Sequence, residues 1–340
     1  MRATLEQWLN RTWYGERPPG LFLRLLEQLY RGACAVARRI DRRNRAVDLE
    51  GRPIIVVGNL TAGGAGKTPL VIRLCELAEG IGLSAGVISR GYGRESRQPV
   101  WARPDARPVD CGDEPLLIAL RTGVPVRVDS DRERAARQVF QRGVDLVISD
   151  DGLQRQSLPR RLELCVVDGE RGFGNGRQLP AGPLREPAAR LADVDYVVEN
   201  LAPGGKTTAM DRFGMRLEPG RFTSLGDAGE VEPAEFADRG KAHAVAGIAM
   251  PARFLATLGQ LGIPLAGHTE FPDHHRFRRE DFDHIPPGIA IVMTEKDAVK
   301  CRGLDLPNAW YLPVSAALDH ALESALAGAM RELCPGDPGV

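Results

Sequence analysis

A buried-type strand that runs directly into a glycine-rich loop and then a helix is the feature that most restricts the fold of this 340-residue chain. The strand pattern is Ile54 to Val57, and the loop reads Gly58-Asn59-Leu60-Thr61-Ala62-Gly63-Gly64-Ala65-Gly66-Lys67-Thr68. Glycines let backbone N–H groups turn toward phosphate oxygens, and the following helix adds its positive N-terminus. We therefore expect residues 61–68 to bind a nucleotide, with Lys67 bridging the β- and γ-phosphates and the Thr68 hydroxyl holding Mg²⁺. Thr61 stands where the usual pattern has glycine, a departure that Gly63 and Gly64 can absorb.

Further β-branched runs alternate with helical stretches and extend this pattern into an α/β sandwich. They are Ile54 to Val57, Ala85 to Ser89, Val144 to Ser149 and Leu164 to Val167. Such alternation predicts parallel strands with sites at their carboxyl ends, a phosphate-loop NTPase-like α/β/α fold. A weaker series follows, comprising Ala242 to Gly247, a helix from about Pro251 to Leu261, and Ile289 to Thr294. We expect a second, smaller α/β domain there, which gives the division 1–50, 51–205, 206–238 as linker, and 239–335.

Composition narrows the partners and the compartment. The formal net charge is zero, so nothing global predicts a nucleic acid partner, and no pattern predicts an obligate protein partner. The six cysteines are widely spaced, which is typical of free thiols in a reducing compartment. No stretch reaches the roughly 18 apolar residues of a membrane-spanning helix, and the N-terminus lacks a secretory signal pattern.

The first 45 residues are unusually basic, with ten arginines against four acids. Within them, apolar residues recur at helical spacing: Phe22, Leu25, Leu26, Leu29, Ala33, Val36 and Ile40. Such a basic amphipathic helix is typical of a segment that lies in a membrane interface. The alternative is a surface helix that packs on its own domain. Trp8, Trp13 and Tyr14 favour the interface, where aromatic rings with one polar edge are enriched.

Four other polar segments are candidates for phosphoryl transfer. Asp150-Asp151-Gly152 ends a strand next to the phosphate loop, where such enzymes bind Mg²⁺ or its water shell. Gly112-Asp113-Glu114-Pro115 places acids in a turn, and Asp273-His274-His275 offers an imidazole that can hold a carboxylate as a base. The turn from Ser89 to Arg94 carries Arg90, which can meet phosphate. In isolation Asp-Asp-Gly is more typical of a turn, but the preceding strand and the phosphate loop favour a site there. Taken singly, the other three segments are more typical of solvated surface.

In order along the chain, these segments and several others resemble the tetraacyldisaccharide 4'-kinases of lipid A biosynthesis. The matching pieces are Gly58 to Pro69, Ser89-Arg90-Gly91-Tyr92, Gly112 to Pro115, Asp131-Arg132, Asp150-Asp151-Gly152-Leu153-Gln154, Leu179 to Pro187, Phe271 to His274, and Thr294-Glu295-Lys296-Asp297. No single piece is specific, but the ordered set is.

The resemblance implies a substrate, a location and a set of roles. It implies that ATP phosphorylates the 4'-hydroxyl of a tetraacyldisaccharide 1-phosphate to give lipid IV-A, at the cytoplasmic face of the bacterial inner membrane. The protein would then be a peripheral membrane enzyme that uses ATP and Mg²⁺. The resemblance also implies roles for particular residues: Asp113 as the base, His274 as its partner, Asp150, Asp151 and Glu186 around Mg²⁺ and the phosphates, and Arg132, Gln154 and Arg185 near the nucleotide or the acceptor.

The chain departs from the family pattern at two places. Arg155 stands where the family commonly has histidine, and Ala249-Met250 stand where it usually has Gly-Asn. Side-chain roles at these positions are therefore in doubt. The segment Thr294 to Asp297 has two open readings, an adenine contact or the cap of a helix.

Two alternative functions are consistent with a phosphate loop. A membrane-associated switch ATPase of the partition type also joins such a loop to an amphipathic helix, but it carries a signature lysine where this chain has Ala62. A kinase or ligase for a soluble metabolite keeps the same core and treats Phe22 to Ile40 as packing.

Overall fold

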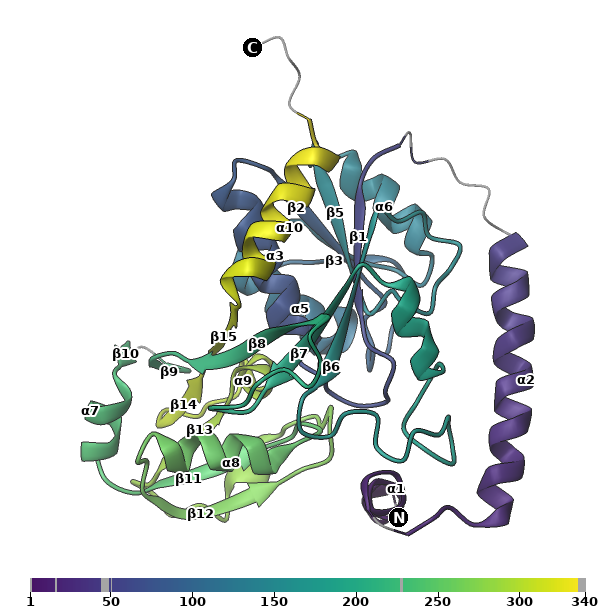
Figure 1. Ribbon diagram of the computed structural model, residues 1–340. Coiled ribbons are helices and arrows are strands. Elements are labelled where there is room, and N and C mark those ends of the chain that lie inside the picture. Colours follow the sequence, from purple (N-terminus) through teal and green to yellow (C-terminus); the bar gives the residue numbers. More distant parts are fainter. Residues whose placement is uncertain (1, 16, 44–48, 50, 227–228, 336–340) are drawn as a thin grey trace.

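The computed structural model describes residues 2–15, 17–43, 49, 51–226 and 229–335. It shows a helical N-terminal segment beside a large α/β domain, with a smaller α/β domain below (Figure 1). Residues 1, 16, 44–48 and 50 of the predicted N-terminal segment 1–50 lie outside the described residues.

The large domain is built on a nine-stranded sheet with β1 near its centre, between β5 and β6. Every pair is parallel except β3 with β4 and β15 with β8. The strand order is β15 (Val314–Leu318), β8 (Arg212–Pro219), β7 (Tyr196–Leu201), β6 (Leu162–Asp168), β1 (Ile54–Gly58), β5 (Leu146–Asp150), β2 (Ala85–Ser89), β4 (Val126–Val128), β3 (Val100–Ala102).

Both faces of this sheet are covered by helices, so the central strands are buried along their whole length. Ile55 and Val57 of β1 pack with α3 (Lys67–Gly80), α5 (Asp113–Thr122) and α10 (His320–Leu333). Ile54 and Val56 face α6 (Arg132–Phe140) and the short helix η1 (Ala188–Asp193). The short α4 (Pro108–Cys111) precedes α5. The predicted fold class, an α/β/α sandwich with a smaller α/β domain, is confirmed.

The smaller domain has a six-stranded sheet with its own core. The strand order is β10 (Glu230–Val231), β9 (Phe222–Ser224), β14 (Ala309–Leu312), β13 (Ala290–Thr294), β11 (Ala242–Ala246), β12 (Leu265–Glu270). Phe254 of α8 (Pro251–Gln260) and Phe236 of α7 (Pro233–Asp238) pack on one side. Phe282 of η2 (Arg279–Phe282) and Ala298 of α9 (Glu295–Cys301) pack on the other.

The chain crosses between the two sheets more than once. β8 lies within the predicted linker 206–238 and pairs with β7 in the large sheet. β15 and α10 lie within the predicted range 239–335, yet β15 pairs with β8 and α10 packs in the core of the large domain. The division at 51–205, 206–238 and 239–335 stays a prediction, and any final boundary has to account for this return of the chain.

Two helices form the N-terminal segment. In α1 (Arg2–Tyr14), the indole Nε1 of Trp13 donates to the carbonyl oxygen of Pro180, 2.9 Å away. In α2 (Leu21–Arg43), the apolar side chains point outward: Phe22, Leu25, Leu29, Val36 and Ile40 are all exposed. The opposite side of α2 faces the protein through Glu27, Tyr30 and Arg38. Among the described helices, none is long and apolar enough to cross a bilayer.

Candidate active site

The phosphate loop joins β1 to α3, and a small polar network holds it in shape. The Asn59 amide donates to the carbonyl oxygen of Thr61 (2.9 Å), and Lys67 Nζ donates to Oδ1 of Asn59 (3.0 Å). Gly63 and Gly66 have φ angles of 105° and 94°, in the left-handed region that favours glycine. Thr61, which replaces the usual glycine, is buried, and its hydroxyl lies 3.3 Å from the Asn59 amide. The loop therefore accommodates Thr61 as a packing residue at its base.

Asp150 and Asp151 follow each other at the carboxyl end of β5 but have opposite electrostatic surroundings. Burial, together with the charges of Glu114 and Asp151, raises the pKa of Asp150 to about 7. Burial also raises the pKa of Asp151, but Lys67 and Arg185 outweigh it and lower the value to about 2. Lys67 Nζ lies 3.3 Å from Oδ1 of Asp151. Asp151 is therefore an anion beside Lys67, whereas at Asp150 the charges of Lys67 and Arg132 do not outweigh burial and the neighbouring carboxylates.

Two buried carboxylate oxygens near the loop have no hydrogen-bond partner, Oδ1 of Asp150 and Oε2 of Glu186. Unpartnered buried oxygens of this kind fit a divalent cation, and oxygen ligands are what Mg²⁺ prefers. In the part of the chain that the structure describes, no three or more His, Cys, Asp or Glu side chains form a metal cage on their own. Mg²⁺ is usually held by one or two carboxylates together with phosphates, and the open oxygens of Asp150 and Glu186 fit that chemistry. That Thr68, Asp150 and Glu186 hold the cation together stays a prediction.

Asp113 and His274 meet across the interface between the two domains. Asp113 is the first residue of α5, where the positive end of the helix stabilises its charge. Nδ1 of His274 lies 3.0 Å from Oδ2 and 3.2 Å from Oδ1 of Asp113. His274 has a φ of 60°, and its ring packs on Tyr92 at 5.0 Å between centroids. The structure thus joins the carboxylate and the imidazole that the sequence places 161 residues apart.

The ionisation of this pair follows from its surroundings. Burial raises the pKa of Asp113, but the hydrogen bond from His274 and the charge of Lys296 outweigh it and lower the value to about 2. Burial lowers the pKa of His274, but the hydrogen bond to Asp113 reverses this, so its pKa lies above the ordinary value. The pair therefore favours an ionised carboxylate beside a protonated imidazole.

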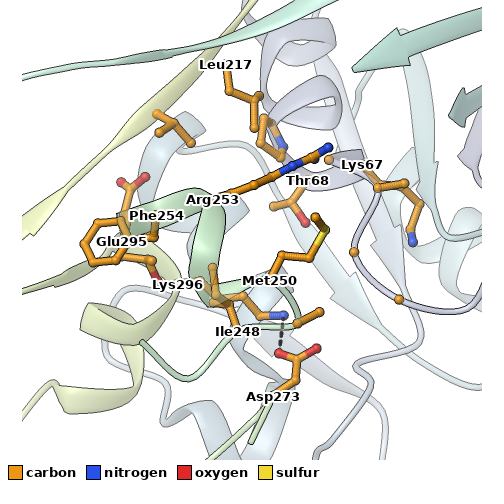
Figure 2. Close-up of a pocket in the computed structure, with 18 of the residues that line it drawn as sticks. Lys67, Thr68, Leu217, Ile248, Met250, Arg253, Phe254, Asp273, Glu295 and Lys296 are labelled. Carbon is orange, nitrogen blue, oxygen red and sulfur yellow. Dashed lines mark hydrogen bonds and ion pairs between the residues drawn. The ribbon is translucent and has the colours of Figure 1, made fainter. Parts of the chain in front are cut away.

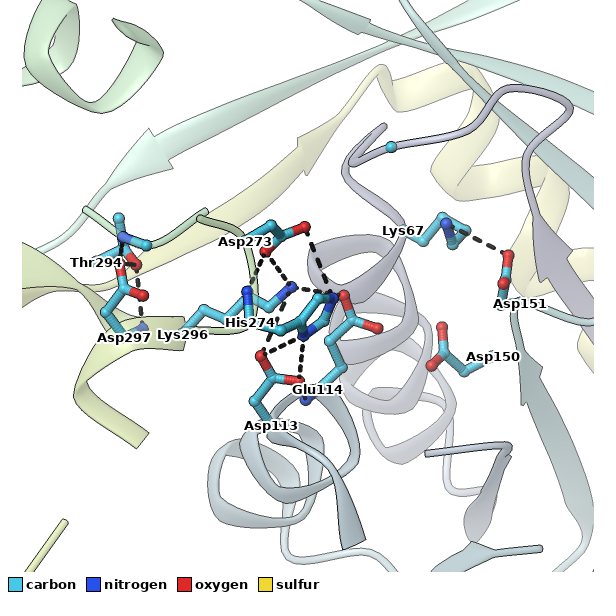
Figure 3. Close-up of polar contacts among 12 residues, drawn as sticks. Lys67, Asp113, Glu114, Asp150, Asp151, Asp273, His274, Thr294, Lys296 and Asp297 are labelled. Atoms are coloured by element: carbon cyan, nitrogen blue, oxygen red, sulfur yellow. Dashed lines mark hydrogen bonds and ion pairs between the residues drawn. The ribbon is translucent and has the colours of Figure 1, made fainter. Parts of the chain in front are cut away.

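A cavity of about 1320 Å³ connects the phosphate loop with the smaller domain (Figure 2). Lys67 and Thr68 line it on one side, and Arg253, His274 and Lys296 line it on the other. Figure 3 shows the Asp113–His274 pair and the Lys67–Asp151 pair as two separate contacts. The cavity therefore connects the phosphate loop with His274, and Asp113 lies buried behind that imidazole.

The four predicted substrate contacts lie in different surroundings. Arg185 lines the cavity and pairs with Asp151 at 3.1 Å, and the Gln154 amide donates to the carbonyl oxygen of Asn59 at 2.9 Å. Arg132 is buried, and its guanidinium donates to the backbone oxygens of Asp150 and Asp151 at 2.8 and 3.2 Å. Arg90 is exposed on the turn that carries Tyr92. Substrate contact by these four residues stays a prediction. The structure adds that Arg132 stabilises the Asp150–Asp151 turn through its backbone oxygens.

Two polar residues of the site were not predicted as site residues. Asn59 holds Lys67, and its place directly after Gly58 in the loop was the available signal. Lys296 lies among three carboxylates, 3.0 Å from Oε1 of Glu114. In the sequence, Lys296 could have been noticed as the one cation in the segment 294–297. In the structure, Thr294 of this segment caps α9 by accepting from the N–H of Asp297.

The two departures from the family pattern also have structural settings. Arg155 lies 3.6 Å from Asp41 of α2, so it contacts the N-terminal segment. Ala249 and Met250 line the cavity in a loop whose backbone is held at Gly247, because Asp297 accepts from the Gly247 N–H (3.0 Å) and Lys300 donates to the Gly247 carbonyl (2.9 Å).

Comparison with known proteins gives one consistent family. Residues 20–331 match the family model described as tetraacyldisaccharide-1-P 4'-kinase. The tetraacyldisaccharide 4'-kinase of Alcanivorax borkumensis is 43% identical over 323 residues, covering 94% of this chain and 96% of that protein. That of Stenotrophomonas maltophilia is 42% identical over 332 residues, covering 95% and 96%. The crystal structure of the "apo" form of LpxK from Aquifex aeolicus in complex with ATP superposes with a TM-score of 0.74 at 26% identity, covering 91% of this chain and 97% of that one.

Proposed function

Because the chain belongs to the tetraacyldisaccharide 4'-kinase family, we propose that it transfers the γ-phosphate of ATP to the 4'-hydroxyl of a tetraacyldisaccharide 1-phosphate, which gives lipid IV-A. The observation that carries this proposal is the placement of His274, which holds the buried Asp113 carboxylate, opposite Lys67 and Thr68 across one cavity. Phosphoryl transfer depends on positioning and charge neutralisation more than on covalent chemistry, and this cavity offers both. The family match disfavours the switch ATPase and the soluble-metabolite kinase.

On the donor side, the phosphate loop and its helix hold the nucleotide. Backbone N–H groups of residues 61–68 and the N-terminus of α3 attract the phosphates. Lys67 exchanges its contacts with Asn59 and Asp151 for the β- and γ-phosphate oxygens. Thr68, Asp150 and Glu186 would hold Mg²⁺, which neutralises charge on the phosphates when bound.

On the acceptor side, Asp113 receives the proton of the attacking hydroxyl and His274 holds the carboxylate in position. A pKa of about 2 makes Asp113 a weak base in the nucleotide-free protein. Two effects offset this weak basicity. The negative phosphates raise the pKa of a nearby carboxylate, and the hydroxyl proton is released late in a loose phosphoryl-transfer transition state.

The acyl chains of the acceptor hold it in a lipid surface, and α2 offers an apolar face that can bind such a surface. Its exposed residues Phe22, Leu25, Leu29, Val36 and Ile40 face away from the protein, so intramolecular packing does not account for them. Apolar residues of this kind enter a membrane interface while flanking arginines meet anionic headgroups. We therefore place the enzyme peripherally at the cytoplasmic face of the inner membrane, where ATP is available.

The proposal is tested by incubating the full-length protein with γ-labelled ATP, Mg²⁺ and tetraacyldisaccharide 1-phosphate in mixed micelles, and separating the lipid products. A labelled lipid that carries one additional phosphate at the 4'-position is expected. If ATP binds and no label enters the lipid, the proposed acceptor is wrong.

A further inference from the structure

The ammonium group of Lys296 lies among three carboxylates at the domain interface (Figure 3). Its Nζ is 3.0 Å from Oε1 of Glu114, 3.5 Å from Oδ1 of Asp273 and 3.7 Å from Oδ2 of Asp113. Lys296 belongs to α9 of the smaller domain, whereas Asp113 and Glu114 open α5 of the large domain. One cation therefore bridges the two domains at the side chain that serves as the base.

The charges around Asp113 explain why a cation is needed there. Three carboxylates gather around the Lys296 ammonium: Asp113 is buried, Glu114 and Asp273 are partly exposed, and like charges at this range repel one another. A protonated His274 supplies one positive charge, and Lys296 supplies the second. Burial alone lowers the pKa of Lys296, but Glu114, Asp113 and Asp273 outweigh it and raise the pKa above the ordinary value. Lys296 is therefore charged at any physiological pH.

We propose that Lys296 is a positioning residue of the phosphoryl transfer: its ammonium holds the Asp113 carboxylate in its contact with His274 and makes a complete base depend on docking of the smaller domain. The inference rests on the proposed function, because it gives Lys296 a task in that reaction. It also separates two contributions of the smaller domain, since His274 orients Asp113 by a hydrogen bond and Lys296 balances the surrounding negative charge.

A neighbouring ion pair distinguishes this task from simple attachment of the two domains. Arg121 of α5 donates to Oε2 of Glu295, the residue before Lys296, at 2.9 Å. Arg121 also donates to the hydroxyl of Ser315 at 3.0 Å. This pair joins the same two helices as Lys296 does, but Arg121 contacts Glu295 and Ser315 rather than Asp113 or His274. Arg121→Met is therefore a matched control that removes a cross-domain cation away from the base.

The contact predicts a change in ionisation that a merely structural role does not produce. The charged groups facing the imidazole of His274 are Asp113 from α5, Lys296 from α9 and Asp273 from its own segment, and the phenol ring of Tyr92 packs against it. Among them, Lys296 lowers the pKa of His274 and the two carboxylates raise it. Removal of the Lys296 charge must therefore raise the pKa of His274, and by the same logic that of Asp113.

The experiment compares the full-length wild-type protein with Lys296→Met, Lys296→Arg and Arg121→Met. Lipid phosphorylation gives kcat and KM, ATP binding is measured separately, and the His274 pKa is obtained by NMR titration with the signal assigned through His274→Asn. We expect Lys296→Met to lower kcat about 10- to 100-fold, part of what a well-placed base contributes, with ATP affinity changed less than about twofold. Lys296→Arg should recover part of the loss, and Arg121→Met should retain kcat within about threefold.

The outcomes separate failure of the inference from failure of the proposed function. A normal kcat in Lys296→Met, or an equal loss in Arg121→Met, overturns the task of Lys296. If the wild-type protein does not phosphorylate the lipid at all, the proposed function fails, and the titration still decides the contact. An upward shift of the His274 pKa in Lys296→Met alone supports the contact, and an unchanged value overturns it. Lys296→Gln serves as the second neutral variant if Lys296→Met does not fold.

Discussion

Nδ1 of His274 and Oδ2 of Asp113 lie 3.0 Å apart, although they belong to different domains. The carboxylate is fixed at the start of α5, and the imidazole is presented by the segment after β12. The proposed base and its partner thus come from the two halves of the protein, while the phosphate loop lies entirely in one of them. Nucleotide binding and base formation are therefore separable properties, and substitutions should affect them differently.

Lys67→Ala is expected to weaken ATP binding by at least about tenfold and to reduce transfer as well, because the β- and γ-phosphates lose their closest cation. The measurement is ATP affinity by calorimetry beside the transfer assay. Arg73→Ala is a suitable control, since Arg73 is a cation on the same helix whose partners are Glu76 and Glu323. Equal ATP affinity in Lys67→Ala and wild type would contradict the donor site.

The Asp113–His274 contact should stabilise the protein within a defined pH window. The pKa of Asp113 is lowered to about 2, so its contribution is present above the unfolded value of about 3.9 and is lost as the pH falls toward 2. The pKa of His274 is raised, so its contribution is full below about 6.5 and is lost as the pH rises through the folded value. Chemical denaturation of wild type and His274→Gln should therefore differ more at about pH 6 than at about pH 9. The same difference at both pH values would show that the pair is not ionic.

Leu29→Glu on α2 should weaken binding to anionic vesicles by roughly tenfold or more, because burying one leucine is worth about 1.5–3 kcal/mol. Leu29 is exposed in the structure, so the substitution leaves the fold intact. Gln28→Glu introduces the same charge beside the apolar face and should bind vesicles more tightly than Leu29→Glu. Vesicle sedimentation measures both, and equal binding of wild type and Leu29→Glu would remove the membrane role of this face.

Glu27→Ala should loosen α2 from the segment 177–186, which Glu27 contacts at Arg177 and Gln178. The Glu27 carboxylate is buried and accepts from the backbone N–H of Gln178 and from Arg177, both at 3.0 Å. Loss of this acceptor leaves a buried N–H unsatisfied, at a cost of about 1–3 kcal/mol. The same segment carries Arg185 and Glu186, which are predicted site residues, so kcat should fall as well. Glu27→Gln keeps an acceptor and should have a smaller effect. Limited proteolysis between α1 and α2 measures the loosening. Equal cleavage of wild type, Glu27→Ala and Glu27→Gln would contradict this prediction.

The sequence was sufficient to predict the parts of the fold that depend on local pattern. Strand, loop and helix around Lys67 follow from β-branched runs, glycines and a helix start, which are all neighbours in the chain. The predicted strand ending at Ser149 corresponds to β5, which continues to Asp150. The amphipathic pattern from Phe22 to Ile40 predicted α2 and its apolar face.

Features that depend on distant contacts could not be predicted in this way. Lys296 and Glu114 are 182 residues apart, and no local pattern links them. Arg132 follows a helix cap, Asp131, so its burial beneath the Asp150–Asp151 turn emerges only when α6 packs on the sheet. β15 returns to the large sheet because it pairs antiparallel with β8, and the local sequence of neither strand indicates its partner.

The most direct test is the rate of lipid phosphorylation by Asp113→Ala at saturating ATP, with ATP affinity measured on the same preparation. Loss of the base should reduce transfer by about 10²- to 10⁴-fold, while ATP affinity stays close to that of wild type because Lys67 and the phosphate loop are untouched. If Asp113→Ala transfers phosphate at a rate near that of wild type, the hydroxyl proton leaves by another route. The Asp113–His274 pair would then hold the two domains together without activating the acceptor.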